Sequence, residues 1–150
     1  MGQTLDIRAI TQQDYSAGLE LAKSAVKELY GIEKFNAIEF NFKVKNLFVF
    51  PGNVTRGIFV DNKMVGFVIC SHNEPLWNDD KKLSIEFFYI DENNRTEENM
   101  NKIYAYVENY AYSNGYSSIR FYDSLPYVAD HIKSFSETKK ISTMYEKEVI

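Results

Sequence analysis

The sequence is poor in the residues that mark several common classes of protein. It has one cysteine, Cys70, and two histidines among 150 residues, so it cannot form an internal disulfide and offers few zinc ligands. No apolar run approaches the roughly 20 residues that span a membrane, and the opening "MGQTLDIRAI" lacks the apolar core of a signal peptide. We therefore expect a cytoplasmic protein that holds no metal and enters no membrane.

An excess of positive charge is also missing. Lys and Arg number 17 against 21 Asp and Glu, which gives a formal net charge of −4. Binding to nucleic acid or to an anionic membrane surface needs the opposite balance, so we expect neither partner. Apolar residues, in contrast, are abundant: they make up 45% of the chain, with eleven Phe and eleven Tyr, as is typical of a packed globule. At this length we predict one domain over residues 1–150.

Local signals predict the elements of the first half of the chain. Residues 4–10 alternate as in a strand, and Thr11 is a suitable N-cap for a helix that ends at Gly31. A second helix is predicted over residues 33–48, before Pro51 and Gly52. The stretch "RGIFVDNKMVGFVICS" predicts a hairpin that turns at Asp61-Asn62-Lys63.

The second half alternates strands with helices. A polar loop over residues 72–82 precedes the apolar strand "LSIEFFYI", and the helix "NKIYAYVENYAYSNG" follows it. Residues 118–122 predict another strand, Pro126 opens a short helix, and residues 141–149 predict a closing strand. The order β-α-α-β-β-β-α-β-α-β predicts an α/β (α+β) fold, with a mixed sheet and helices on both faces.

With these elements in this order, the chain resembles the GCN5-related N-acetyltransferase (GNAT) family over nearly its whole length. The resemblance is carried by the opening strand and two helices, the hairpin "GIFVDNKMVGFVI", the strand "LSIEFFYID", the helix ending "YAYSNGYSSIRF" and the closing "FSETKKISTMYEKEV". It implies a GNAT-like, mostly antiparallel sheet. It also implies an enzyme that moves an acetyl group from acetyl-CoA to an amine acceptor, which is a small molecule or a protein.

The loop "DENNRTEENM" between the strand and the helix departs from the family pattern. In the family it reads Arg or Gln, two residues, Gly, one residue, then Gly or Ala, and its amides cradle the coenzyme A pyrophosphate at a helix N-terminus. Arg95 takes the first position here, whereas Glu98 and Met100 take the glycine positions. We expect both side chains to hinder the approach of a phosphate to the main chain.

The resemblance also implies where the cofactor contacts lie. The strand end at Phe88, Tyr89 and Ile90 would hold the pantetheine arm, while the loop and the helix start would touch the phosphates. The residues expected to contribute there are Arg95, Thr96 and Asn99. A second interpretation of the same loop needs no cofactor, because Thr96 can cap the helix and the acidic residues that follow can satisfy its dipole.

N-acetyl transfer needs a base for the amine and an acid for the leaving thiolate. Glu86 is the only charged residue in "LSIEFFYI", and the resemblance places a family base on this strand. The alternative for Glu86 is a charge that faces solvent from one side of the sheet. The acid in the family is usually a Tyr on the last helix, and here both Tyr127 and His131 in "SLPYVADHIKSF" are candidates.

Two functions are consistent with these patterns. One is an acetyl-CoA-dependent N-acetyltransferase. The other is a GNAT-like domain without activity that serves as a structural or adaptor subunit, for example in a phage particle, and that forms a homo-oligomer or binds an assembly partner. The altered loop and the many aromatic residues favour the second function; its location would then be the virion if the gene belongs to a phage. The fold alone does not decide between them.

Overall fold

The computed structural model describes residues 4–32, 34, 36–74, 76, 80–121 and 147–148. The described residues form a sheet of five strands in the order β1-β2-β3-β4-β5, in which neighbours in sequence are neighbours in space. The strands are β1 (Leu5–Ala9), β2 (Asn53–Val60), β3 (Lys63–Asn73), β4 (Lys82–Ile90) and β5 (Ser118–Phe121). The first four are paired antiparallel, whereas β4 and β5 are parallel.

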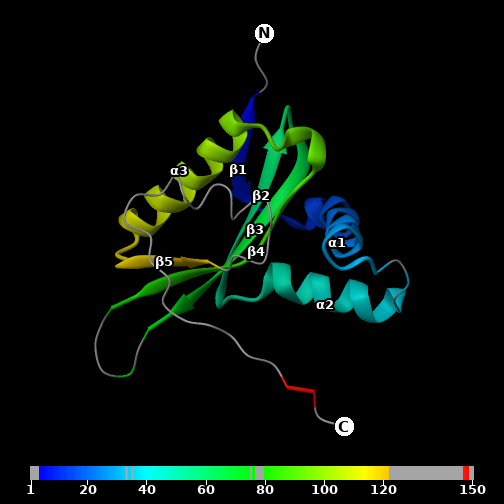
Figure 1. Ribbon diagram of the computed structural model, residues 1–150, viewed down its shortest axis with the longest axis horizontal. Helices are drawn as coiled ribbons and strands as arrows, with labels where there is room; N and C mark the ends of the chain where they lie inside the picture. The colour runs from blue at the N-terminus through cyan, green and yellow to red at the C-terminus, as the bar shows by residue number, and fades with distance from the viewer. Residues whose placement is uncertain are drawn as a thin grey trace.

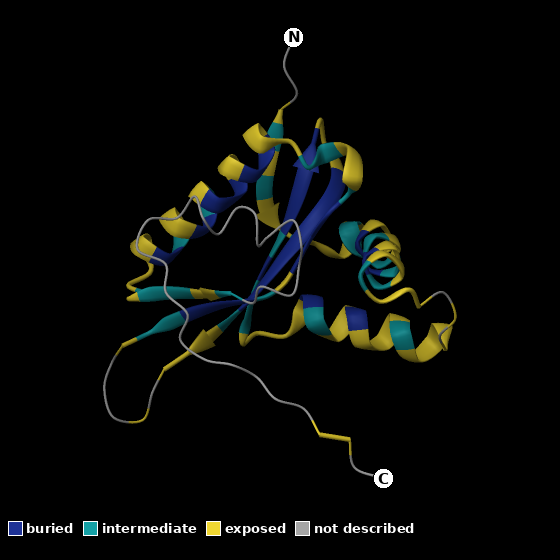
Figure 2. Ribbon diagram, viewed as in Figure 1, coloured by how far each residue is buried: buried dark blue, intermediate teal, exposed yellow. Residues whose placement is uncertain are grey.

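Helices cover both faces of this sheet (Figure 1). Helices α1 (Tyr15–Tyr30) and α2 (Ala37–Val49) pack on one face, around a cluster that includes Phe48, Phe67 and Ile69. Helix α3 (Glu97–Ser113) packs on the other face, where Met100, Ile103 and Val107 contact the apolar side of the central strands. Figure 2 shows the central strands buried between the two helical layers.

Short polar signals set the ends of the elements. Thr11 and Asp14 form a capping box in a 3₁₀ turn, η1 (Gln12–Asp14), that leads into α1. Gly31 ends α1 with a φ of 67°, a left-handed conformation that costs glycine little. At the tip of the β2–β3 hairpin, Asp61 and Asn62 adopt φ values of 51° and 67°, which two-residue hairpin turns require. A second 3₁₀ turn, η2 (Glu92–Asn94), follows β4.

The predicted fold class is confirmed: the sheet is mixed, mostly antiparallel and covered by helices on both faces. The predicted order holds as far as β5, while the short helix after Pro126 and the strand over residues 141–149 lie outside the described residues.

Two boundaries were wrong. The second helix begins at Ala37 rather than near residue 33, because the Asn36 side chain accepts a hydrogen bond from the Glu39 amide and caps it there. The polar loop is shorter than predicted because His72 and Asn73 continue β3, paired with Leu83 and Lys82 of β4.

Candidate active site

The sheet opens along one edge of β4. Among the described residues, pairing between β4 and β5 covers residues 82–85 and 118–121, and its last pair joins Ile85 to Phe121. From Glu86 to Ile90, β4 keeps its antiparallel partner β3. The Asp91 amide donates to the Val65 carbonyl, so the main-chain groups of Asp91 point toward β3. Main-chain groups of successive residues in a strand point to alternate edges, so those of Phe88 and Ile90 point to the opposite, open edge. An extended ligand can therefore meet main-chain groups along this edge.

A β-bulge lies where the opening begins. Ile85 pairs with Cys70 and Phe87 pairs with the adjacent Ile69, so Glu86 is the extra residue of β4. Before the bulge, Ile85 faces α3, and after it Phe88 and Ile90 do. The bulge thus places two consecutive side chains, Glu86 and Phe87, on the face that α1 and α2 cover. This cannot be read from the strand sequence, since regular alternation would separate them.

A serine on the neighbouring strand orients Glu86. The Ser71 hydroxyl donates a hydrogen bond of 2.6 Å to Oε1 of Glu86, and the carboxylate is half-buried. No partner of the second oxygen, Oε2, is seen among the described residues. Glu86 therefore has one oxygen that is fixed and one that can accept a proton or bind an ammonium group.

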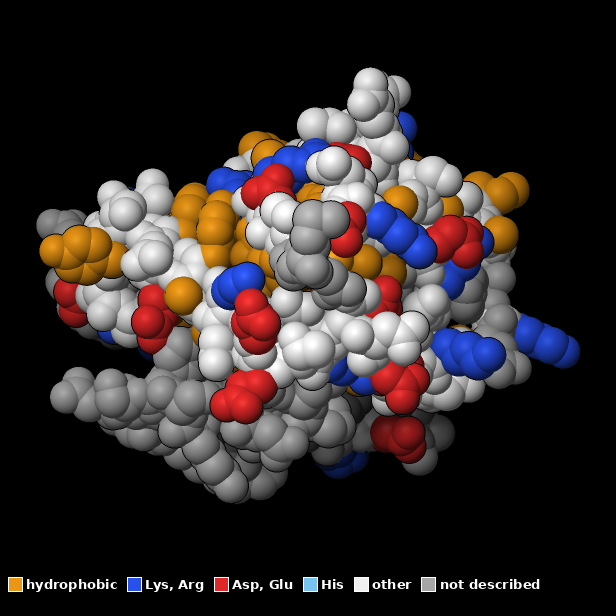
Figure 3. Space-filling model, turned by 90° about the horizontal axis from the view of Figure 1, so that it is seen from above, with side chains coloured by type: hydrophobic (Ala, Val, Ile, Leu, Met, Phe, Trp, Pro, Cys, Tyr) orange, Lys and Arg blue, Asp and Glu red, His pale blue; other side chains and the backbone are white. Residues whose placement is uncertain are grey.

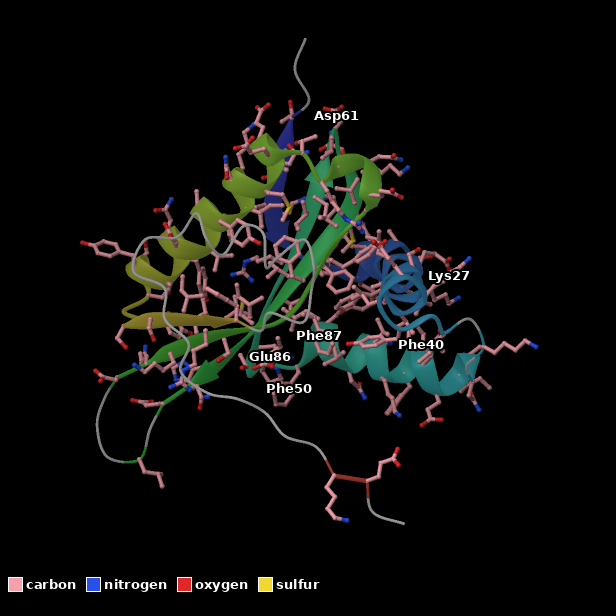
Figure 4. The ribbon with its side chains drawn as sticks, viewed as in Figure 1. Lys27, Phe40, Phe50, Asp61, Glu86 and Phe87 are labelled. Carbon is pink, nitrogen blue, oxygen red and sulfur yellow. The ribbon has the colours of Figure 1, made fainter. Side chains whose placement is uncertain are left out.

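Glu86 lines a cavity of about 270 Å³ between the sheet and the two N-terminal helices. The walls come from α1, α2, β3, β4 and the end of β5. Aromatic side chains contribute much of the surface, among them Phe40 and Phe48 of α2 and Phe67 of β3. Figure 4 shows Glu86, Phe87 and Phe40 in the layer between the sheet and α2. A cavity that joins a carboxylate at a strand opening to an apolar wall is a suitable ligand site.

The start of α3 lies at the far end of β4. Thr96 is its N-cap, and its hydroxyl accepts a hydrogen bond of 3.1 Å from the Asn99 amide. The Asn99 side chain donates to the carbonyl of Asn94, and Asp91 caps the preceding η2 turn. The predicted capping by Thr96 is thus confirmed. Seen from above in Figure 3, the acidic and basic side chains of the described residues are intermixed on this face.

Arg95 turns away from α3 toward α1. Its guanidinium makes two contacts of 2.6 Å with the carboxylate of Glu28, and its Nε donates 2.8 Å to the Ile90 carbonyl. The hydrogen bond from Arg95 lowers the pKa of Glu28 below its ordinary value. Burial, followed by a hydrogen bond to Glu28, raises the pKa of Tyr89 to about 12. Arg95, Glu28 and Tyr89 form a cluster, the Arg95 latch, that connects α1 to the loop before α3.

Solved structures share this architecture. A possible acetyltransferase from Clostridium difficile 630 superimposes with a TM-score of 0.80 at 21% identity, over 97% of this chain and 98% of its own. An aminoglycoside acetyltransferase from an uncultured soil metagenomic sample, in complex with sisomicin, gives a TM-score of 0.75 at 14% identity, over 97% and 96%. A predicted acetyltransferase from Clostridium acetobutylicum with acetyl-CoA gives 0.69 at 16%, over 95% and 96%.

The chain has the GNAT acetyltransferase fold. No protein-family model and no curated protein matches the sequence. At identities this low, the similarity concerns the fold alone. The open edge, the bulge and the cavity are described from this chain's own residues.

Within the GNAT fold, the two side chains at the glycine positions of the loop behave differently. Met100 is 1% exposed and belongs to the core beneath α3, so the expectation that it hinders a phosphate was wrong. It was wrong because this position of α3 faces the sheet. Glu98 is exposed, and its carboxylate lies 3.2 Å from Nζ of Lys102 one turn further along the helix. Any obstruction by side chains at these two positions therefore comes from Glu98.

The remaining predicted site residues divide into three groups. Phe88, Tyr89 and Ile90 are buried and turn alternately toward α3 and toward α1 and α2. Thr96 and Asn99 use their side chains to hold the loop. Tyr127 and His131 lie outside the described residues. Among the described residues there is no group of three metal-ligating side chains and no helix long and apolar enough to cross a membrane.

Sequence reasoning missed Glu28, Ser71 and the cavity walls on α1 and α2. Glu28 lies 67 residues from Arg95, and Ser71 lies 15 residues from Glu86. No local pattern connects either pair. The register of β3 on β4 was the only signal that could have placed Ser71 beside Glu86, and the bulge shifts that register.

Proposed function

We propose that this protein is an N-acetyltransferase that moves an acetyl group from acetyl-CoA to an amine acceptor. The observation that carries the proposal is the opening of β4 at Glu86: within the described residues, the pairing of β4 with β5 ends just before the residue whose carboxylate lines a largely apolar cavity. The opening supplies an edge for an extended thioester arm, and the cavity supplies a place for the acceptor. Glu86 lies where the two meet.

The described residues fit acetyl-CoA along this edge. Main-chain groups of Phe88 and Ile90 face the open side of β4, although the Ile90 carbonyl already accepts from Arg95. The first amides of α3 point out of the helix and carry its positive dipole end, which suits a pyrophosphate. Arg95 could reach a phosphate only by leaving Glu28, so we assign the phosphate contacts to the main chain at Glu97 and Glu98 and keep Arg95 as a second contributor.

Acetyl-CoA would supply an activated acetyl thioester. Transfer from sulfur to nitrogen requires the amine to lose a proton and the departing thiolate to gain one. Glu86 is the group that we assign as base, because its side chain lines the cavity while the Ser71 hydroxyl donates to Oε1. Tyr127 and His131 remain the candidates for the acid.

Calorimetry with acetyl-CoA tests the cofactor, and acetyl transfer to a panel of amines tests the base. We expect saturable binding and, at a hundred times the dissociation constant, a gain in stability of about 2.7 kcal/mol. Glu86→Gln should abolish most transfer without weakening acetyl-CoA binding. Glu108→Gln, at an exposed position of α3, is the matched control and should behave as wild type. Absence of binding at millimolar acetyl-CoA would refute the proposal.

A structural or adaptor subunit is the second candidate, and the outer face of α2 favours it. Ile38 and Phe42 are 84% and 66% exposed, and Val49 and Phe50 extend this apolar strip to the end of the helix. Such a strip is costly to leave in water and is common at contacts between proteins. Light scattering after gel filtration would test it: a monomer at high concentration, unchanged by Phe42→Ser, would count against a homo-oligomer through α2.

A further inference from the structure

Few charged side chains line the described part of the cavity beside Glu86. Among the described residues that line it, only Glu86 and Lys43 are charged. Lys43 lies on α2 with its side chain 69% exposed, and it pairs at 2.9 Å with Glu39 on the outside of the same helix. The nearby carboxylate of Glu28 is held by Arg95 at 2.6 Å. A ligand in the cavity therefore meets one carboxylate that no described cation neutralises.

The walls of the cavity are apolar and aromatic. Phe40, Phe48, Phe67 and Phe87 present their rings from both helical and strand elements. An ammonium group placed against such a wall, away from Glu86, would lose its hydration without gaining a partner. A ring or a branched alkyl group would gain from the same contact. The wall thus selects against a second charge on the ligand.

The volume sets a limit on size. A cavity of about 150 Å³ holds a benzene molecule, so about 270 Å³ suits one ring with a short aminoalkyl chain. An aminoglycoside consists of several linked rings that carry several amino groups. The aminoglycoside acetyltransferase described above shares the fold, but the described walls of this cavity supply one carboxylate, which is fewer than such a polycation needs.

We infer that the acceptor is a small primary amine with a single positive charge on an aromatic or branched apolar body. This inference rests on the proposed function and specifies its substrate class. The ammonium group binds Oε2 of Glu86, which Ser71 holds in place through Oε1. The apolar body lies among the phenylalanines of α2, β3 and β4.

Calorimetry without cofactor tests the inference directly, with 2-phenylethylamine, spermidine and kanamycin as probes. We expect 2-phenylethylamine to bind at least tenfold more tightly than either polycation. Tighter binding of kanamycin or spermidine, or no binding of 2-phenylethylamine at millimolar concentration, would overturn the inference.

Variants separate the charged contact from the apolar one. Glu86→Gln should weaken binding of 2-phenylethylamine about tenfold and leave the uncharged analogue 2-phenylethanol unaffected. Phe87→Ala should weaken both ligands about fivefold. Phe50→Ala is the matched control, because Phe50 is 58% exposed against 47% for Phe87 and does not line the cavity. Figure 4 labels both rings. Equal effects of the two alanine variants, or equal loss of amine and alcohol in Glu86→Gln, would contradict the assignment.

The two proposals fail separately. If acetyl-CoA does not bind but 2-phenylethylamine does, the transferase function is wrong and the amine site stands. If acetyl-CoA binds and the protein acetylates kanamycin in preference to 2-phenylethylamine, the transferase function stands and the inference about the acceptor is wrong.

Discussion

Glu28→Gln tests whether the Arg95 latch holds α1 to the loop before α3. The substitution keeps the shape of the side chain but removes the charge that receives two contacts of 2.6 Å from Arg95. Charge-assisted hydrogen bonds contribute about 1.5–3 kcal/mol when shielded. The side chains of Arg95 and Glu28 are 18% and 39% exposed, so solvent reduces the value, and we expect a loss of about 1–2 kcal/mol. For a chain of this length that lowers Tm by about 3–6 °C.

The control lies on the same helix. Glu20 pairs with Lys23 at 3.3 Å, and its side chain is 71% exposed, so Glu20→Gln should cost less than about 0.5 kcal/mol. Urea unfolding at pH 7, followed by circular dichroism, measures both variants against wild type. Equal destabilisation by the two substitutions would refute the latch.

The dependence on pH provides a second check. Arg95 lowers the pKa of Glu28 in the folded state below its ordinary 4.5. The stabilisation is therefore fully present above pH 4.5 and is lost as the pH falls through the lowered folded value. The difference between wild type and Glu28→Gln should shrink when the unfolding series is repeated at decreasing pH below 4.5. A difference that does not change with pH would mean that the charge is not its cause.

Three further predictions concern the base, the loop and the thiol. Glu86→Gln should lower kcat/KM for amine acetylation by about 10²–10⁴-fold. A loss below tenfold in steady-state assays would exclude Glu86 as the general base. Glu98→Gly should tighten acetyl-CoA binding about two- to fivefold in calorimetry by removing a carboxylate beside the first amides of α3; Glu108→Gly removes an exposed carboxylate further along the same helix, and equal tightening by both would show that the position at the helix start is irrelevant. Burial raises the pKa of Cys70 to about 12, so the thiol should resist Ellman's reagent at pH 8 until urea unfolds the chain; prompt labelling of the native protein would contradict its burial.

The order of elements could be predicted because local chemistry controls it. The cap at Thr11, the glycine at residue 31 and the Asp61-Asn62 turn each act on neighbouring main-chain groups, and each appears in the structure where the sequence placed it. Thr96 caps α3 for the same reason.

The tertiary structure decided which way the side chains point and which of them meet. The bulge at Glu86 places two successive residues on one face, and it arises from pairing with a strand that lies elsewhere in the chain. Arg95 contacts a carboxylate 67 residues away, and Met100 turns into the core because of how α3 sits on the sheet. These outcomes depend on packing between elements that are far apart in the sequence, and local sequence patterns do not contain that information.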